Sequence, residues 1–218
     1  MNNYKSTIKA FCQLYSMLCA IALALLINNY LSIEIEATAS ASTINDTQNT
    51  VLKFVNCIIL ILLVVRFFHR NIVFINKNYF ELKKLNSVNM FVDLSLMLIQ
   101  ALLIIGMSIV ESKKAYDVVM ALIFTDALWM LFVVAKNNFN CSEVVPVAIK
   151  WLVANLLTAF MMLNFRLMIN QELKLNISNM IIVLFNIIIN FYMCYAFLKT
   201  ERECNNSNDT NIIHGNTE

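Results

Sequence analysis

Residues 51–84 read VLKFVNCIILILLVVRFFHRNIVFINKNYFELKK, in which an apolar run of fifteen residues is followed by a cluster of basic side chains. The run predicts a membrane span, because an α-helix rises about 1.5 Å per residue and about 20 residues cross the hydrocarbon layer. The basic cluster indicates the cytoplasmic end of this span, since Lys and Arg are enriched in cytoplasmic loops. We expect these residues of the cluster to lie at the interface, in contact with lipid headgroups: His69, Arg70, Lys77, Lys83 and Lys84.

The composition of the whole chain is that of a membrane protein. Apolar residues make up 60% of the 218 residues, charged residues make up 14%, and the mean hydropathy is +0.68. A soluble domain has about 45–50% apolar and roughly 25% charged residues. The chain has 2 Gly and 1 Pro, which favours unbroken helices, because channels and transporters use both residues to interrupt them. We therefore expect an all-α, polytopic transmembrane bundle.

Six apolar runs define the predicted spans of this bundle, which forms one transmembrane domain over residues 1–198. The spans cover about residues 8–33, 51–70, 88–110, 116–135, 147–169 and 178–198. A secretory signal peptide is the alternative interpretation of the first run, but that run is longer than the apolar core of a signal peptide. Residues 199–218 are polar, and we expect them to form a disordered tail.

The basic residues also predict the orientation of the bundle. With an even number of spans, both termini lie on the same side of the membrane. Eleven of the sixteen Lys and Arg residues fall on that side under this segmentation. Because basic residues are enriched on the cytoplasmic side, both termini are predicted to be cytoplasmic, in a plasma or inner membrane.

A layer of polar residues is expected near the middle of the bilayer. Asp126 lies about 15 Å from either end of its span. Further polar residues fall within about one helical turn of that depth: Gln100, Asn155, Thr158 and Asn186. Two interpretations fit this layer, namely hydrogen bonding between helices and an ion or proton site in which Asp126 titrates. The second predicts that the Asp126→Asn exchange keeps the fold and abolishes pH-driven flux.

A structural ion pair is expected nearer the cytoplasmic surface. Arg66 and Asp93 each lie about one to two turns inside the membrane, on consecutive spans. An unpaired charge in hydrocarbon is unfavourable, so these two residues are predicted to bind each other. Trp129, three residues after Asp126, is predicted to pack in the core.

Catalytic and metal-binding motifs are not found in the sequence. The chain has 2 His residues, and it contains no H-E-x-x-H, G-x-S-x-G or glycine-rich phosphate loop. The 6 cysteines are scattered without a C-x-x-C pair, so we expect no metal, disulfide or cofactor. Intramembrane catalysis by Asp93 and Asp126 is the weakest hypothesis, because their depths differ by about two turns, which is too far for a shared proton.

The sequence therefore favours a small channel or carrier component for an ion or proton. The alternative is a non-catalytic membrane scaffold, whose basic residues after the second span hold anionic lipid or another protein. The expected partners are the lipid bilayer and either further copies of the chain or another membrane subunit. The net charge of +2 arises from clustered loop residues and does not indicate nucleic-acid binding.

Overall fold

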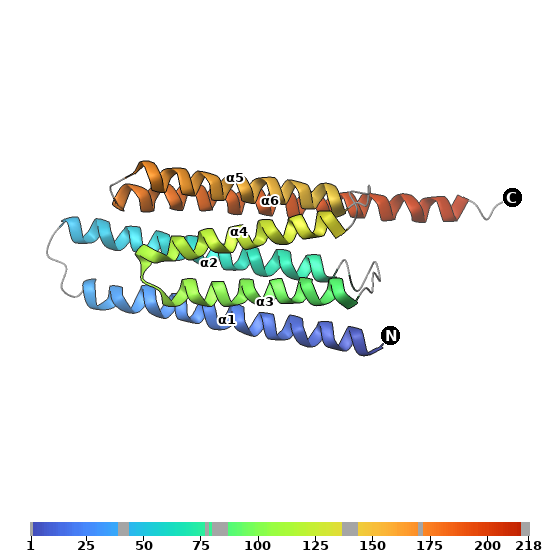
Figure 1. The fold of residues 1–218 in the computed structure, drawn as a ribbon, viewed down its shortest axis with the longest axis horizontal. Coiled ribbons are helices and arrows are strands. Elements are labelled where there is room, and N and C mark those ends of the chain that lie inside the picture. The colour runs from blue at the N-terminus through green and yellow to red at the C-terminus, as the bar shows by residue number, and fades with distance from the viewer. Residues whose placement is uncertain are drawn as a thin grey trace.

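The computed structural model of the chain describes residues 2–38, 44–76, 79, 87–136, 144–169 and 172–214. These residues form long helices and no strand (Figure 1). The helices are α1 (Asn2–Thr38), α2 (Ile44–Ile75), α3 (Ser87–Ile109), α4 (Ser112–Lys136), α5 (Val144–Met168) and α6 (Glu172–His214). Neither Gly nor Pro interrupts α2, α4 or α6, in keeping with the unbroken helices expected from the composition.

Each helix contains a segment that is long and apolar enough to cross a membrane. The segments are Lys5–Tyr30, Thr50–Ile75, Val88–Ile109, Lys114–Lys136, Pro146–Met168 and Leu173–Tyr195. The predicted all-α bundle of six spans is therefore confirmed, and the protein is an integral, multi-pass membrane protein. The start of α1 and the end of α6 lie at the same end of the bundle (Figure 1).

Two helices continue beyond the ends of the predicted spans. α2 ends at Ile75 rather than near residue 70. α6 continues to His214, whereas the sequence predicted a disordered tail from residue 199. No Gly or Pro occurs in α6, and Gly215 is the first such residue after it, so the helix contains neither of the two strongest helix breakers. Residues 215–218 of the predicted tail lie outside the described residues.

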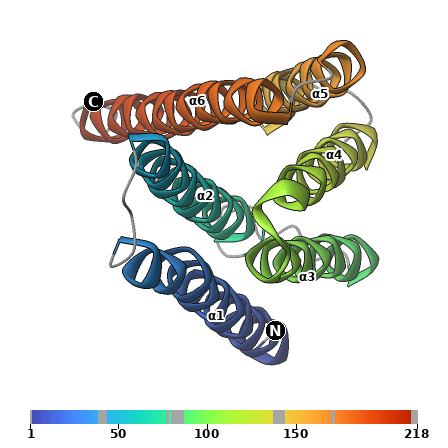
Figure 2. The ribbon, with the colours of Figure 1, turned by 90° about the vertical axis from the view of Figure 1, so that its left-hand side faces the viewer.

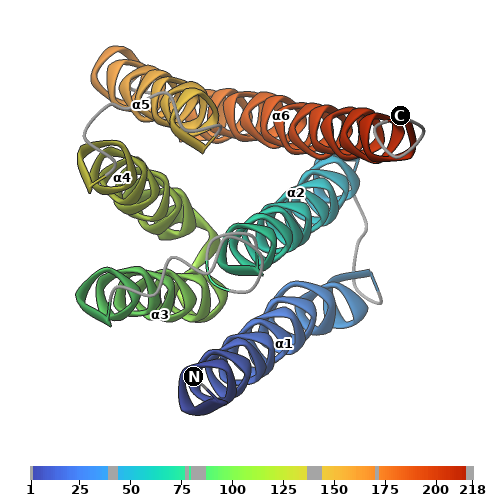
Figure 3. The same ribbon diagram turned by 90° about the vertical axis from the view of Figure 1, so that its right-hand side faces the viewer.

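The helices pack in a closed ring. Going round it, the order is α1, α2, α6, α5, α4 and α3, and α3 returns to α1. Figure 2 and Figure 3 show this order from the two ends of the bundle. α2 therefore packs mainly against α1 and α6, although α3 follows it in the sequence. Polar side chains that point into the ring can meet from helices that are distant along the chain.

The outer faces of the helices are apolar, as expected for contact with lipid. On α1 the buried residues are spaced by three, four or seven positions, which is one face of a helix: Ile8, Tyr15, Cys19, Ala22 and Leu26. Met17 and Ile21 lie between these positions and are exposed. A helix that is apolar on its exposed side as well as its buried side is suited to a bilayer rather than to water.

Candidate functional site

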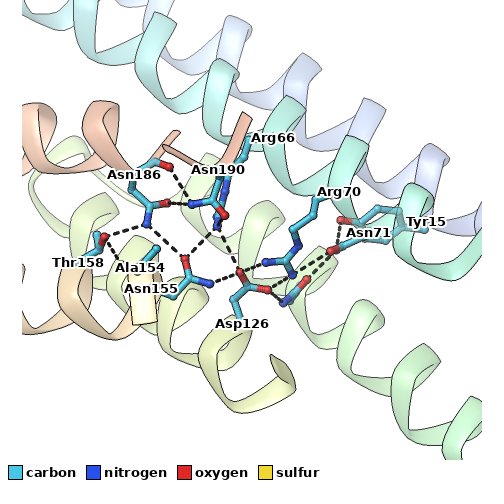
Figure 4. A network of polar contacts seen from close by, with 11 residues as sticks. Tyr15, Arg66, Arg70, Asn71, Asp126, Ala154, Asn155, Thr158, Asn186 and Asn190 are labelled. Carbon is cyan, nitrogen blue, oxygen red and sulfur yellow. Dashed lines mark hydrogen bonds and ion pairs between the residues drawn. The ribbon is translucent and has the colours of Figure 1, made fainter. Parts of the chain in front are cut away.

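The polar residues near the middle of the ring form one buried hydrogen-bonded network (Figure 4). Every one of the six helices contributes to it. The predicted layer is brought together in this network, with Gln100 on α3, Asp126 on α4, Asn155 and Thr158 on α5, and Asn186 on α6. The structure adds residues that the sequence had not placed there: Tyr15 on α1, Arg66, Arg70 and Asn71 on α2, and Asn190 on α6.

Asp126 is the centre of the network and is fully buried. Its Oδ1 accepts hydrogen bonds from Gln100 Nε2 at 2.9 Å and from Arg70 Nη2. Its Oδ2 accepts from Asn155 Nδ2 at 2.6 Å, from Arg66 Nη2 at 3.3 Å and from Arg70 Nη1. Arg70 thus binds the carboxylate through both of its terminal nitrogens, which is the strong bidentate arrangement. Donors therefore occupy both carboxylate oxygens.

Within the described part of the chain, Arg66 makes its hydrogen bonds through one nitrogen only. Its Nη2 donates to Asn190 Oδ1 at 2.7 Å, to Asn155 Oδ1 at 3.0 Å and to Asp126 at 3.3 Å. Its Nε and Nη1 are buried, as is Nε of Arg70, and within the described residues none of these three nitrogens has a hydrogen-bond acceptor. A buried donor without an acceptor costs about 1–3 kcal/mol. The two arginines therefore keep unused donors inside the bundle.

The network carries more positive than negative charge. Arg66 and Arg70 both contact Asp126, and within the described residues Asp126 is the only carboxylate that pairs with them. Two guanidinium groups and one carboxylate leave an excess of one positive charge in a buried environment.

Two amide side chains extend the network along α6. Asn190 Nδ2 donates to the backbone oxygen of Asn186 at 2.8 Å. Asn186 Nδ2 donates to Thr158 Oγ1 at 2.8 Å and to Asn155 Oδ1 at 3.2 Å. The Thr158 hydroxyl in turn donates to the backbone oxygen of Ala154 at 2.8 Å. Polar side chains therefore line the interface between α5 and α6 for more than one helical turn.

On the other side of Asp126 the network reaches α1. Asn71 Nδ2 donates to Gln100 Oε1 at 2.7 Å and to the Tyr15 hydroxyl at 2.8 Å. Asn71 was not predicted because it follows the basic cluster, where the span was expected to have ended. Tyr15 gave no signal either, since a tyrosine in an apolar run is an ordinary packing residue.

The second buried carboxylate, Asp93, belongs to a separate cluster. It accepts hydrogen bonds from Lys136 Nζ at 2.5 Å, from Trp129 Nε1 at 2.8 Å and from the Tyr79 hydroxyl at 2.5 Å. Trp129 is fully buried, as predicted. Tyr79 lies between the second and third spans, where burial, followed by the charge of Asp93, raises the pKa of its hydroxyl above the usual value. Tyr79 thus remains a donor to the carboxylate.

The predicted ion pair between Arg66 and Asp93 is wrong. Arg66 pairs with Asp126, and Asp93 pairs with Lys136. The reason is the order of helices in the ring, since α2 packs mainly against α1 and α6 while α3 packs mainly against α1 and α4. Equal depth on consecutive helices did not make these two residues neighbours.

The prediction that Arg70 lies among lipid headgroups is also wrong. Arg70 is 2% exposed and binds Asp126. Because α2 continues to Ile75, Arg70 lies more than one turn before the end of its helix and points into the ring. His69 is exposed, and its ring stacks on Phe191 with 6.4 Å between centroids. The remaining predicted headgroup residues, Lys77, Lys83 and Lys84, lie outside the residues whose side chains are described.

The described part of the chain offers few other groups for metal binding or catalysis. It contains no group of three or more His, Cys, Asp or Glu residues that could hold a metal ion. Its cysteines Cys12, Cys19 and Cys194 are free thiols. Asp93 and Asp126 each have their own basic partners. No protein-family model, no curated protein and no solved structure matches this chain.

Proposed function

We propose that the protein is a small membrane carrier or channel component for an inorganic anion, and that Arg66, Arg70 and Asp126 form its binding element. The observation that supports this proposal is the excess positive charge of the buried network, together with its unused guanidinium donors. A monovalent anion such as a halide or nitrate would neutralise the excess and accept the unused hydrogen bonds.

Helix association alone gives no reason for this set of side chains. Neutral Asn and Gln residues suffice to hydrogen-bond helices to each other, at roughly 0.6–2 kcal/mol per bond. Arginine at the centre of a membrane helix costs about 2.5–3.5 kcal/mol on insertion scales, and a buried cation needs a counter-charge. Since Asp126 can neutralise one of the two arginines, the remaining charge favours an anionic ligand.

The surroundings of Asp126 favour an anion over a proton or metal cation. A metal cation would need oxygen ligands, and both oxygens of Asp126 already accept hydrogen bonds, as do the amide oxygens of Asn155 and Asn190. It would also approach the guanidinium groups of Arg66 and Arg70, which repel it. The unused nitrogens Nε and Nη1 of Arg66 offer hydrogen-bond donors instead, and these attract an anion.

Anion flux in reconstituted liposomes tests the proposal. The wild-type protein should release chloride or nitrate faster than protein-free vesicles when valinomycin and potassium clamp the membrane potential. Arg66→Gln removes the excess charge but keeps a donor for Asn155 and Asn190, so the flux should fall to background. The control is Lys53→Gln, which removes an exposed cation from the same helix and should leave the flux unchanged.

Binding can be measured independently of transport. Chloride or nitrate should raise the melting temperature of the wild-type protein in detergent relative to gluconate at equal ionic strength, because a ligand that binds only the folded state stabilises it. Arg66→Gln should lose this response. Flux of potassium or protons instead of anions would contradict the proposal and favour a cation or proton carrier. Equal anion responses in wild type and Arg66→Gln would also contradict it, and the absence of any flux would favour the scaffold hypothesis.

A further inference from the structure

A cavity of about 170 Å³ opens between α4, α5 and α6 at the end of the bundle away from the termini. Its lining includes Asp117 and Met120 of α4, Met162 and Arg166 of α5, and Asn176 and Asn179 of α6. Asp117 and Arg166 form an ion pair, and their side chains are 47% and 49% exposed. Both residues lie close to the ends of their spans, so the mouth of the cavity is at the membrane surface.

One buried polar side chain lines the cavity. Asn179 is 6% exposed and lines the cavity. Its Oδ1 is buried and has no hydrogen-bond donor among the residues that the structure describes. A buried amide oxygen needs a donor, which water in the cavity can supply. The cavity of about 170 Å³ is large enough, because one water needs about 10–15 Å³.

The cavity and the buried network lie along the same faces of α5 and α6. On α5, Met162 is four residues from Thr158, which is three residues from Asn155, and these spacings place all of them on one face. On α6, Asn179 is seven residues from Asn186, which is two helical turns on the same face. Met162 lines the cavity, and Thr158 belongs to the network. Only about 6 Å along the helix axis separates them.

We propose that this cavity is the access vestibule of the buried site and that the side chain of Met162 is the barrier between the two. The anionic nature of the ligand rests on the function proposed above, whereas the path itself rests on the cavity and on the positions along α5 and α6. Met162 is buried, and methionine is unbranched and flexible, so a rotamer change can move it without moving a helix.

Thiol reactivity at the inner end of the path tests this proposal. In a background without the native cysteines, Thr158→Cys is reconstituted in liposomes and treated with a negatively charged, membrane-impermeant thiol reagent. Adding Met162→Ala to the Thr158→Cys variant should raise the rate at which the reagent modifies the new cysteine at least tenfold, when the reagent is added on the side of the turn between α3 and α4. Reagent added on the side of the termini should give no such increase.

The matched control is Met161→Ala, which makes the same exchange at the adjacent position of α5, where the side chain is 39% exposed on the outer face. It should leave the modification rate unchanged. A second variant, Met162→Leu, keeps a bulky side chain and should also keep the slow rate. All variants are compared at equal helix content by circular dichroism, which detects misfolding.

Anion flux distinguishes failure of the path from failure of the proposed function. Faster modification in Met162→Ala without anion flux in any variant would support the path and refute anion transport. Arg66-dependent anion flux with equal modification rates in Met162→Ala and Met161→Ala would support transport and overturn the path. Faster modification from the side of the termini would overturn it as well.

Discussion

Asp126 is the carboxylate that the described structure places between two buried guanidinium groups. The sequence suggested that Asp126→Asn would leave the fold intact, because the exchange is nearly isosteric. The structure changes this expectation, since the exchange leaves Arg66 and Arg70 buried without a counter-charge. Breaking a buried ion pair by removing one partner costs about 3–5 kcal/mol. We therefore predict that Asp126→Asn lowers the free energy of unfolding by about this amount, as measured by denaturation in detergent.

A second aspartate on α4 provides the control for this prediction. Asp117 pairs with Arg166, and both side chains are about half exposed. Exposed ion pairs contribute roughly 0–1 kcal/mol, so Asp117→Asn should have little effect. The double variant Asp126→Asn with Arg70→Gln should recover part of the lost stability, because one of the unpaired charges is then removed. Equal losses for the two aspartate variants would mean that the charges of the network are not buried as described.

Tyr79 is predicted to make the stability of the protein depend on pH above pH 10. Its hydroxyl donates to Asp93, and burial together with that carboxylate raises its pKa. In the unfolded chain a tyrosine has a pKa of about 10. The stabilisation from Tyr79 is therefore complete below pH 10 and is lost as the pH rises above 10, where only the unfolded chain gives up the proton.

Comparison with Tyr79→Phe isolates this contribution. The variant should be less stable than wild type by about 1 kcal/mol at pH 7, since the hydrogen bond to Asp93 is missing. Because the wild type alone loses the Tyr79 contribution, the difference between the melting temperatures should shrink above pH 10. Tyr192→Phe, at an exposed position on α6, should show no such convergence. A constant difference up to pH 11 would contradict the prediction.

For the helices, the sequence predicted well how deep each polar residue lies in the membrane, but it predicted poorly which residues interact with each other. Depth follows from the constant rise of a helix, so counting residues placed Gln100 and Asn155 at the level of Asp126. Partners depend on which helices are neighbours and on which face each side chain lies. The ring order separates α2 from α3, and this is why Arg66 does not reach Asp93. Arg70 was misplaced because the basic cluster was interpreted as the cytoplasmic end of the span, whereas α2 continues to Ile75.

Asn155 connects α5 to three other helices, and we predict that its loss destabilises the bundle. It donates to Asp126 on α4 and accepts from Arg66 on α2 and from Asn186 on α6. Asn155→Leu removes these bonds and leaves buried polar groups with fewer partners, so the free energy of unfolding should fall by about 1–3 kcal/mol. The effect is measured by SDS-induced unfolding. Leu156→Ala, at the next position on the outer face, should change stability by less than about 0.5 kcal/mol.

At the scale of the whole molecule, the ring explains how few residues can carry a function. Each helix exposes an apolar face on the outside and offers one or a few polar side chains to the inside, and those side chains meet because the ring is closed. A chain with 14% charged residues can thus gather two arginines and an aspartate at one place in the membrane. The sequence could predict the six spans from hydrophobicity, whereas the convergence of their polar residues depends on tertiary packing.

The basic residues outside the buried network predict the orientation of this ring in the membrane. Arg66 and Arg70 are buried, so they no longer count toward the loop charges that set orientation. Of the remaining fourteen Lys and Arg residues, nine lie on the side of the termini under the predicted segmentation, so the expected cytoplasmic location of the termini is unchanged.

Lys5 on α1 and Glu111 in the turn between α3 and α4 are exposed at opposite ends of the bundle. In intact cells expressing variants without native cysteines, Glu111→Cys should react with an external impermeant maleimide, whereas Lys5→Cys should react only after permeabilisation. The reverse pattern would mean that the protein has the opposite orientation, with the vestibule at Arg166 on the cytoplasmic side. Reaction of both cysteine variants with external maleimide would contradict the six-span bundle itself.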